Sequence, residues 1–297
     1  MNEPLLILRS VLYVPADNER ALAKAASLDC DAVIFDLEDA VAPAAKETAR
    51  EALRVRFKQG GSSEQSSAIR VNGIGTAWFT EDLLAARSVV PDAIVVPKVS
   101  SVEDLRLVED ALSETDAPAS IKIWAMIETV RGVSAIAEIA GHAASADNRL
   151  AAMIVGTNDL FKEAGISGDD ARALIHPWLM QIVLAAKANG IAILDGVYND
   201  FRDLGGYGAE CDMSARMGFD GKTLIHPSQI IHANSAFGPD PAMLEEAQQI
   251  ADAFALPENA DKGVISLAGK MVERLHLDQA LELLDRAKAI EMRRSGK

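Results

Sequence analysis

Eight short segments rich in valine, isoleucine and leucine alternate along the chain with segments of helical spacing. The apolar segments span residues 9–15, 32–39, 67–73, 93–99, 121–129, 150–159, 191–197 and 221–227. Each is almost continuously apolar, which is typical of parallel strands covered on both faces. Helix-sized segments such as 18–28 and 45–57 separate them. Strands that alternate with helices predict a parallel sheet.

Eight strand–helix units predict an α/β protein built as a closed (β/α)8 TIM barrel. A doubly wound sheet is the alternative, but that fold places a glycine-rich phosphate-binding turn after its first strand. Here the turn is VPADNER, residues 14–20, which contains no glycine. We therefore favour the barrel.

The strand-like segments stop near residue 240. Residues 241–256 have the spacing of an amphipathic helix, residues 257–263 have a loop composition, and a short β-like segment and a final helix follow. This pattern predicts a catalytic barrel of residues 1–238 and a helical C-terminal extension of residues 239–297. We expect the extension to act as a lid or as a subunit-contact arm.

Polar side chains stand at or near the end of most predicted strands. In chain order they are Asp36, Glu38 and Asp39, then Arg70 and Asn72, then Lys98, Glu128, Asn158 and Asp159, Asp195 and His226. In a (β/α)8 barrel the carboxyl ends of the strands form one rim, where barrel enzymes place their active sites. The distribution therefore predicts a polar site at that rim.

Glu128 and Asp159 follow neighbouring strands and form the most informative pair. Two carboxylates with open positions for water suit Mg²⁺, which proteins usually hold through one or two carboxylates plus substrate oxygens. Three further acids could orient bound water around such an ion, namely Asp36, Glu38 and Asp39. Arg70, a cation within an apolar strand, suits bidentate binding of a substrate carboxylate.

Each of these residues also has a structural interpretation, and the pattern alone leaves both open. Glu128 could cap the next helix or pair with Arg131, and Asp159 could be a helix N-cap. Arg70 could pair with the acids of the second strand, which could themselves form a solvated edge. We expect purely structural roles for the remaining candidates Lys98, His176 and His226, and a flexible loop at GGYG, residues 205–208.

The formal net charge of −15 narrows the range of partners. An acidic surface argues against nucleic acid and anionic membranes as partners. The two cysteines, Cys30 and Cys211, do not form a C-x-x-C pair and do not imply a disulfide framework. The apolar stretch in MNEPLLILRS is too short for a signal peptide, and no window has the apolar length of a bilayer span. We therefore expect a cytoplasmic protein.

Five sequence blocks are informative together: DLEDAV at 36–41, IRVNG at 69–73, IETVRG at 127–132, GTNDL at 156–160 and IHPSQI at 225–230. Together they resemble the citrate lyase β-subunit-like branch of the HpcH/HpaI aldolase superfamily. The resemblance extends over about residues 9–275. It implies a Mg²⁺-dependent TIM barrel that acts on acyl-CoA thioesters and 2-oxo-acids and assembles as a homotrimer or hexamer.

The resemblance also implies individual roles. Glu128 and Asp159 correspond to the metal ligands, and Arg70 to the arginine that binds the oxo-acid carboxylate. Glu38 and Asp39 correspond to acids that order metal-bound water. The substrate is expected beside the end of the sixth predicted strand, at Gly156, Thr157 and Asn158. The phosphates of CoA need cations, for which Arg9, Arg20 and Lys24 are candidates.

Two departures from the family pattern bear on the reaction. Asn158 stands where the family usually has glutamate, and Glu273 of GKMVE stands where many relatives have the aspartate of G-x-M-I-D. That aspartate reaches a neighbouring subunit's site and handles the proton on the acyl-CoA methyl carbon, so the resemblance implies Glu273 as the catalytic acid or base. The implied activity is cleavage or formation of malyl-, citramalyl- or citryl-CoA. A free 2-oxo-acid aldolase, a malyl-CoA-type thioesterase and a partner-dependent subunit are the alternatives.

Overall fold

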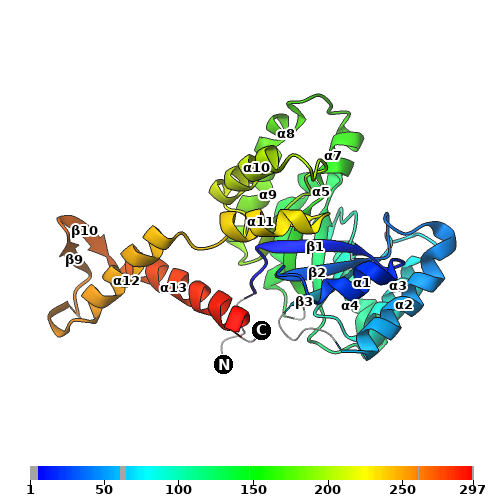
Figure 1. Ribbon diagram of the computed structural model, residues 1–297, viewed down its shortest axis with the longest axis horizontal. Coiled ribbons are helices and arrows are strands. Elements are labelled where there is room, and N and C mark those ends of the chain that lie inside the picture. The colour runs from blue at the N-terminus through cyan, green and yellow to red at the C-terminus, as the bar shows by residue number, and fades with distance from the viewer. Residues whose placement is uncertain (1–5, 61–64, 147, 260, 296–297) are drawn as a thin grey trace. The chain divides into compact units, whose positions relative to one another are not determined.

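Eight parallel strands close into a barrel, as the alternation of apolar and helical segments predicts (Figure 1). The computed structural model describes residues 6–60, 65–146, 148–259 and 261–295. The strands are β1 (Ser10–Pro15), β2 (Ala32–Asp36), β3 (Ser66–Arg70), β4 (Ala93–Val96), β5 (Lys122–Ile127), β6 (Leu150–Val155), β7 (Ala192–Asp195) and β8 (Gly221–Leu224). They pair in sequence order, and β8 pairs with β1 to complete the (β/α)8 TIM barrel.

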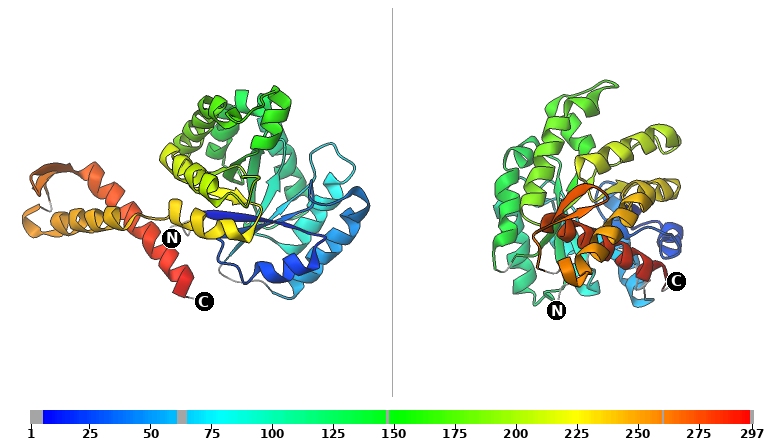
Figure 2. Two further views of the ribbon diagram at one scale, coloured as in Figure 1. Left: turned by 45° about the horizontal axis from the view of Figure 1, so that its top comes forward. Right: turned by 90° about the vertical axis from the view of Figure 1, so that its left-hand side faces the viewer.

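Helices surround the barrel in the order expected for this fold (Figure 2). They are α1 (Glu19–Ala25), α2 (Lys46–Lys58), α3 (Phe79–Val89), α4 (Val102–Glu114), α5 (Val130–Ser134), α6 (Ile136–Gly141), α7 (Thr157–Ala164), α8 (Ala171–Leu174), α9 (His176–Ala188), α10 (Leu204–Met217) and α11 (Ile230–Ala236). Within the described residues, no helix combines the length and apolar character that crossing a membrane requires.

Alternate residues of β1 to β7 belong to two different apolar cores. One set faces the barrel interior and includes Val11, Ile34, Ala68, Trp124 and Met126. The other set packs outward against the helices and includes Leu12, Val33, Ile69, Ile123 and Ile127. Because side chains alternate along a strand, a polar residue an even number of positions after an interior residue also points inward. This alternation determines which strand-end residues reach the mouth of the barrel.

The described residues divide into two compact units, those within 8–237 and those within 6–7 and 238–295. The second unit contains α12 (Pro241–Ala255), an antiparallel hairpin of β9 (Val264–Leu267) and β10 (Lys270–Glu273), and α13 (Arg274–Ser295). Its small core includes Phe254, Ile265 and Val272. A role for this unit as lid or subunit-contact arm stays a prediction.

The prediction of a loop at GGYG was wrong, because residues 205–208 lie within α10. The helix begins after Asp203, whose carboxylate accepts a hydrogen bond from the Gly206 N–H. Tyr207 and Cys211, one turn apart, are completely buried against the barrel. Burial of this apolar face therefore outweighs the low helix propensity of three glycines.

Candidate active site

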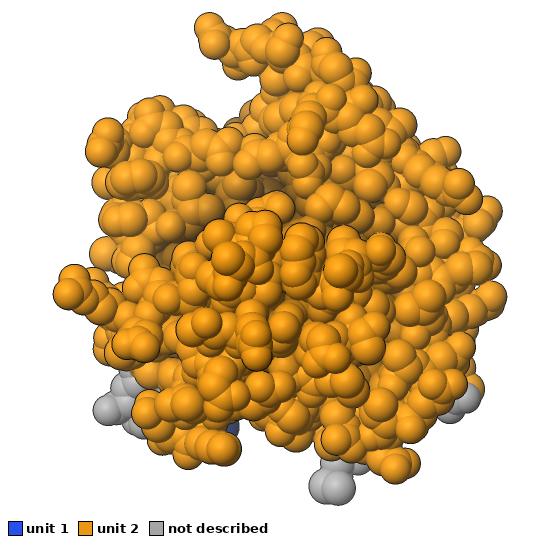
Figure 3. Space-filling view, turned by 90° about the vertical axis from the view of Figure 1, so that its right-hand side faces the viewer, with its two compact units in different colours: residues 1–7, 238–297 blue, residues 8–237 orange. Residues whose placement is uncertain are grey.

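Three charged side chains point into the mouth of the barrel from the ends of β2, β3 and β5. Asp36 and Arg70 lie two positions after the interior residues Ile34 and Ala68, and Glu128 lies two positions after Met126. All three are largely buried, at 1%, 9% and 4% exposure. The alternation of the strands thus brings together residues that are far apart in the sequence. The face of this unit drawn in Figure 3 is hollowed.

Arg70 is held by Asp36 through two parallel hydrogen bonds. Its Nε donates to Asp36 Oδ1 at 2.7 Å and its Nη2 donates to Asp36 Oδ2 at 2.6 Å. Its Nη1 lies 3.2 Å from Glu38 Oε2, and the guanidinium lies over the Tyr13 ring, 4.9 Å from the centroid. Burial alone would lower the pKa of Arg70, but the bonds with Asp36 raise it well above its ordinary value.

Asp36 occupies the Nε–Nη2 edge of Arg70, so the predicted bidentate grip on a substrate carboxylate would use the other edge and stays a prediction. The carboxylate of Asp36 accepts both hydrogen bonds of the Nε–Nη2 edge, as expected if Arg70 pairs with an acid of the second strand. Nη1 is the nitrogen that remains directed at Glu38, so a contact with a substrate carboxylate through Nη1 stays a prediction. Asp36 also accepts hydrogen bonds from the N–H groups of Glu38 and Ala40. It therefore orients Arg70 and the loop after β2 rather than facing a metal ion itself.

Glu128 is a buried carboxylate surrounded by other acids. Its Oε1 accepts a hydrogen bond from the backbone N–H of Lys98 at 2.9 Å. Burial, followed by the carboxylate of Glu38, raises the pKa of Glu128 to about 8, and Asp159 adds to the rise. The following helix α5 is capped by Thr129, whose hydroxyl accepts from the Gly132 N–H, so Glu128 is free of that role.

Asp159 lies in the first turn of α7, two positions after the helix begins. The N-cap position belongs to Gly156, so the prediction that Asp159 could be a cap was wrong. The side chain of Asp159 is 34% exposed, and its Oδ2 lies 4.0 Å from Lys98 Nζ. A partly exposed carboxylate next to the buried Glu128 gives two hard oxygen donors at adjacent strand ends.

Glu38 and Asp39 differ in how firmly they are held. Glu38 is buried between Arg70 Nη1 and Lys98 Nζ, and its Oε2 has no hydrogen-bond partner among the residues that the structure describes. Asp39 has a side chain that is 67% exposed, with its Oδ2 3.9 Å from Arg70 Nη1. Both acids line the mouth, where they could orient water, and Glu38 is the better fixed of the two.

The sequence pattern placed Lys98 at the rim of the barrel but gave no indication of its contacts with the acids there. Its Nζ donates to Glu38 Oε1 at 2.6 Å, its backbone N–H reaches Glu128, and its backbone adopts a positive φ of 57°. The lysine at the end of the fourth predicted strand gave no sign of that backbone conformation. The expectation of a minor structural role rested on its residue type alone.

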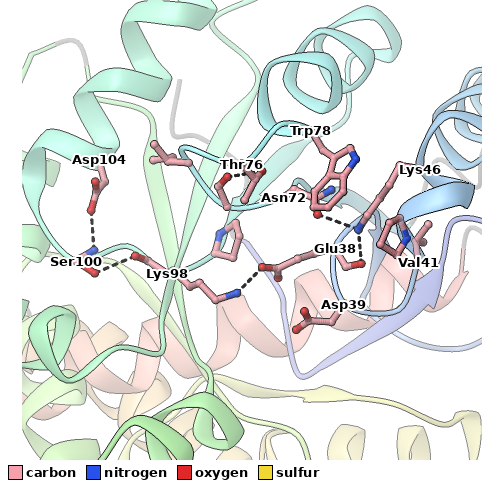
Figure 4. A pocket seen from close by; sticks show the side chains of 14 residues that line it. Glu38, Asp39, Val41, Lys46, Asn72, Thr76, Trp78, Lys98, Ser100 and Asp104 are labelled. Carbon is pink, nitrogen blue, oxygen red and sulfur yellow. Dashed lines mark hydrogen bonds and ion pairs between the residues drawn. The ribbon is translucent and has the colours of Figure 1, made fainter.

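A cavity of about 590 Å³ lies beside the Lys98–Glu38 pair, and Figure 4 draws the side chains that line it. It lies among the loops that follow β2, β3 and β4. Lys46 contributes a buried ammonium that donates to Leu37 O, Glu38 O and Asn72 Oδ1, and Trp78 lies over that ammonium. The cavity therefore has one polar wall next to the carboxylates and enough volume for a small organic acid.

Gly156 makes room for the Glu128 carboxylate. A Cβ atom built on Gly156 would lie 2.5 Å from Glu128 Oε2 and closer still to Glu128 Cβ. Thr157 is buried, whereas Asn158 turns to the loop after β7 and forms two amide hydrogen bonds with Asn199. The close approach of Gly156 and Glu128 is a structural reason for the glycine in GTNDL.

The donor set fits a Mg²⁺ ion held partly by water and substrate. Within residues 6–60, 65–146, 148–259 and 261–295, no three histidine, cysteine or acidic side chains are grouped so that they could hold a metal ion together. Two carboxylates are nevertheless sufficient for Mg²⁺, which keeps several waters. The crowding that raises the pKa of Glu128 also favours a cation. Glu128 and Asp159 are the residues that would hold it.

The other candidates lie apart from this cluster or in the other unit. Arg9 donates two hydrogen bonds to Asp31 beside the amino end of β1 and is buried there, which argues against the predicted contact with CoA phosphate. Arg20 and Lys24 are exposed on α1. Glu273 ends β10 in the second unit, where its N–H donates to His276 Nδ1, so its catalytic role stays a prediction.

His176 and His226 have structural surroundings, in line with the expectation for both. His176 is the first residue of α9. His226 precedes the 3₁₀ turn Pro227–Gln229 and accepts a hydrogen bond from the Ser228 N–H. Its ring stacks on Phe201 at a centroid distance of 4.5 Å.

We expect Gly156→Ala to damage the site while the barrel still folds. The added methyl group would collide with the Glu128 side chain and move a buried carboxylate by part of an ångström or more. Misplacement of that size can lower kcat by about a hundredfold. Gly141→Ala is the matched control, because a Cβ there meets nothing within 4 Å. Equal loss of kcat in both variants would contradict this interpretation of Gly156.

Comparison with known proteins assigns the chain to a family of enzymes. Residues 9–227 match the HpcH/HpaI aldolase/citrate lyase family, and the chain belongs to that family.

Relatives with assigned names resemble the chain over nearly its whole length. It is 45% identical over 282 residues to a (3S)-malyl-CoA thioesterase of Cereibacter sphaeroides, covering 95% of both chains. It is 30% identical over 286 residues to the citrate lyase subunit beta of Haemophilus influenzae, covering 95% of this chain and 97% of that one. The CitE protein of Mycobacterium tuberculosis, solved with magnesium, acetoacetate and coenzyme A, superposes with a TM-score of 0.74. It is 32% identical, and the match covers 95% of this chain and 98% of that chain.

Proposed function

We propose that this protein is a Mg²⁺-dependent carbon–carbon lyase that cleaves or forms β-hydroxyacyl-CoA thioesters such as malyl-, citramalyl- or citryl-CoA. Its products in the cleavage direction would be acetyl-CoA and a 2-oxo-acid. The observation that carries the proposal is the pairing of Glu128 and Asp159 beside the interior cation Arg70. The complex of the similar CitE protein with magnesium, acetoacetate and coenzyme A supports it.

The bond that breaks joins the hydroxyl-bearing carbon to the carbon next to the thioester. The hydroxyl oxygen gives its proton to water and its carbon becomes a carbonyl, while the electrons of the broken carbon–carbon bond pass to the thioester fragment as an enolate. Bound Mg²⁺ would supply Lewis-acid polarisation of the oxo-acid oxygen. Arg70 Nη1 would orient the oxo-acid carboxylate, and backbone N–H groups at the start of α7 would bind beside it.

Glu273 is proposed as the acid that protonates the enolate carbon, or as the base that removes that proton in the condensation direction. The family resemblance suggests that a neighbouring subunit of a homotrimer or hexamer supplies it. Glutamate is one methylene longer than aspartate, so its carboxylate would approach the carbon from a slightly different position.

A thioesterase is the second candidate, and one observation favours it. The Cereibacter sphaeroides relative at 45% identity, which aligns with nearly the whole chain, is named a (3S)-malyl-CoA thioesterase. In that reaction Glu273 would position water at the thioester carbonyl, and CoA would leave. The active-site carboxylates and Arg70 would bind the malyl group in the same way in both reactions.

The deciding experiment is a product analysis of (S)- and (R)-malyl-, citramalyl- and citryl-CoA, with Mg²⁺ and with EDTA. The proposal predicts acetyl-CoA and a 2-oxo-acid in equal amounts, formed with Mg²⁺ and abolished by EDTA. Free CoA without acetyl-CoA would establish the thioesterase instead. Cleavage of free pyruvate aldols without turnover of any thioester would remove CoA from the reaction and leave a simple aldolase.

A further inference from the structure

Lys98 contacts three acids that come from three different strand ends. Its Nζ donates to Glu38 Oε1 at 2.6 Å, and Figure 4 shows the side chain directed at that carboxylate. The same Nζ lies 4.0 Å from Asp159 Oδ2, and the backbone N–H of Lys98 donates to Glu128 Oε1. The one residue thus connects Glu38 with both of the proposed metal ligands.

The backbone of Lys98 adopts an unfavourable conformation that hydrogen bonds and packing around it maintain. A φ of 57° lies in the left-handed region, where glycine would cost less free energy than lysine. Two hydrogen bonds hold the backbone immediately after the Lys98 Cα atom. The Val99 N–H donates to Met126 O at 3.1 Å, and the carbonyl of Lys98 accepts from Ser100 Oγ at 3.0 Å.

Helix α5 also packs closely against the turn that contains Lys98. A Cβ built on Gly132 would collide with the carbonyl oxygen of Val99, so α5 packs directly against the turn. Strained backbone that its surroundings over-determine is characteristic of functional sites. Here the conformation directs the Lys98 N–H at Glu128, while the Lys98 side chain extends to Glu38 and Asp159. A glycine at this position would keep the N–H contact but lose the two side-chain contacts.

We propose that Lys98 is a positioning residue that holds the carboxylate cluster in the arrangement that binds a divalent cation. The proposal rests on the cation site of the proposed function. Glu38, Glu128 and Asp159 repel one another, and the ammonium of Lys98 fixes the spacing of Glu38 and Asp159 while the N–H fixes Glu128. Lys98 and Glu38 carry opposite charges, so together they change the net field at the cation site little and contribute mainly geometry.

The test is the dissociation constant of Mn²⁺, used as a probe for Mg²⁺, measured by electron paramagnetic resonance on the full chain without substrate. We expect Lys98→Met and Lys98→Gly to bind Mn²⁺ about 10–100-fold more weakly than the wild type, the range found for groups that support metal ligands. Glycine suits the left-handed backbone, so Lys98→Gly keeps the N–H contact and isolates the ammonium. Lys98→Arg, which retains the charge, should restore binding to within about threefold. Lys58→Met, at an exposed position in α2, is the control and should bind like the wild type.

The double variant Lys98→Met/Glu38→Gln separates geometry from charge. If the pair acts as one positioning unit, the double variant binds Mn²⁺ as weakly as Lys98→Met. Recovery of wild-type affinity in the double variant would show that only the field matters, which would overturn the proposal. Wild-type or tighter binding by Lys98→Met or Lys98→Gly would also overturn it.

Glu128→Gln distinguishes failure of this inference from failure of the proposed function. If Glu128→Gln loses Mn²⁺ and the Lys98 variants keep it, the cation site stands and the role of Lys98 is refuted. If Glu128→Gln binds Mn²⁺ like the wild type, the proposed cation site is refuted, and the positioning role with it. Circular dichroism of each variant confirms that the folded chain is being compared.

Discussion

Glu128→Gln is expected to lose Mg²⁺-dependent turnover by about a thousandfold or more and, in EDTA, to unfold at a higher temperature than the wild type. The first effect follows because a neutral amide replaces one of two carboxylate ligands, and metal polarisation contributes several kcal/mol to such reactions. The second follows because Glu128 is buried beside Glu38 and Asp159, which penalises its charge.

The pH dependence of the second effect has a definite sign. Burial and neighbouring acids raise the folded-state pKa of Glu128 from 4.5 to about 8. The wild type therefore loses stability as pH rises from about 4.5 through 8, and the glutamine variant lacks this loss. At pH 8 in EDTA we expect the variant to be more stable by about 2 kcal/mol, after allowance for relaxation around the charge. Chemical denaturation at pH 5 and pH 8 measures the difference.

Two results would contradict this account of Glu128. One is wild-type turnover with Mg²⁺ in the glutamine variant, which would remove Glu128 from the metal site. The other is equal stability of variant and wild type in EDTA at pH 8, which would mean that the carboxylate is not penalised in the fold. Glu103→Gln is the control for the substitution itself, because Glu103 is exposed in the first turn of α4.

The barrel and most of its rim follow from the sequence because both depend on local patterns. Continuous apolar segments followed by polar residues identify the strands and their ends, and parallel strands place those ends together. The same continuous segments hide which face each residue occupies, because strands buried on both sides show no alternation. Asp195 illustrates this: it ends β7 like the other acids, yet it points outward and is buried against Lys222 and Arg172.

Contacts that depend on backbone conformation or on distant partners were beyond the sequence. Nothing in the letters PKVS indicates that Lys98 adopts a positive φ or reaches Glu38 across the mouth. Likewise, an arginine within an apolar strand could bind a substrate carboxylate or pair with Asp36. Only the register of β2 and β3, which places Asp36 beside Arg70, shows that the Nε side of the guanidinium binds Asp36. The sequence identified the residues of the site more reliably than their partners.

The buried ion pair of Lys222 and Asp195 supports the fold rather than the chemistry, and its loss should be costly. Both side chains are completely buried, with Lys222 Nζ 2.5 Å from Asp195 Oδ2 and 2.7 Å from Glu210 Oε1. Burial alone would raise the pKa of Asp195, but Lys222 and Arg172 lower it to about 2. Asp195 therefore stabilises the fold at neutral pH, and this contribution is lost as pH falls from about 4 to about 2.

Lys222→Met is expected to lower the free energy of unfolding by about 3 kcal/mol at pH 7, because it leaves a buried carboxylate with one cation fewer. Removing both partners in Lys222→Met/Asp195→Asn should cost about 2 kcal/mol less than the sum of the two single variants, since neither charge is then left alone. Urea denaturation of all three variants measures this coupling.

The matched control is Lys288→Met, which removes the same type of pair at a site where both side chains are about 70% exposed. Exposed pairs contribute between about 0 and 1 kcal/mol, so this variant should unfold almost like the wild type. A Lys222→Met variant as stable as Lys288→Met would show that Arg172 and Ser214 alone satisfy Asp195, through their bonds to the same Oδ2. A much larger loss of stability in Lys222→Met than in Lys288→Met would show that Asp195 depends on its buried partner. In this respect Asp195 differs from Glu128, the other buried acid considered above. Asp195 is a fully paired carboxylate that stabilises the fold, whereas burial and neighbouring acids make the charged form of Glu128 unfavourable, which a bound cation would relieve.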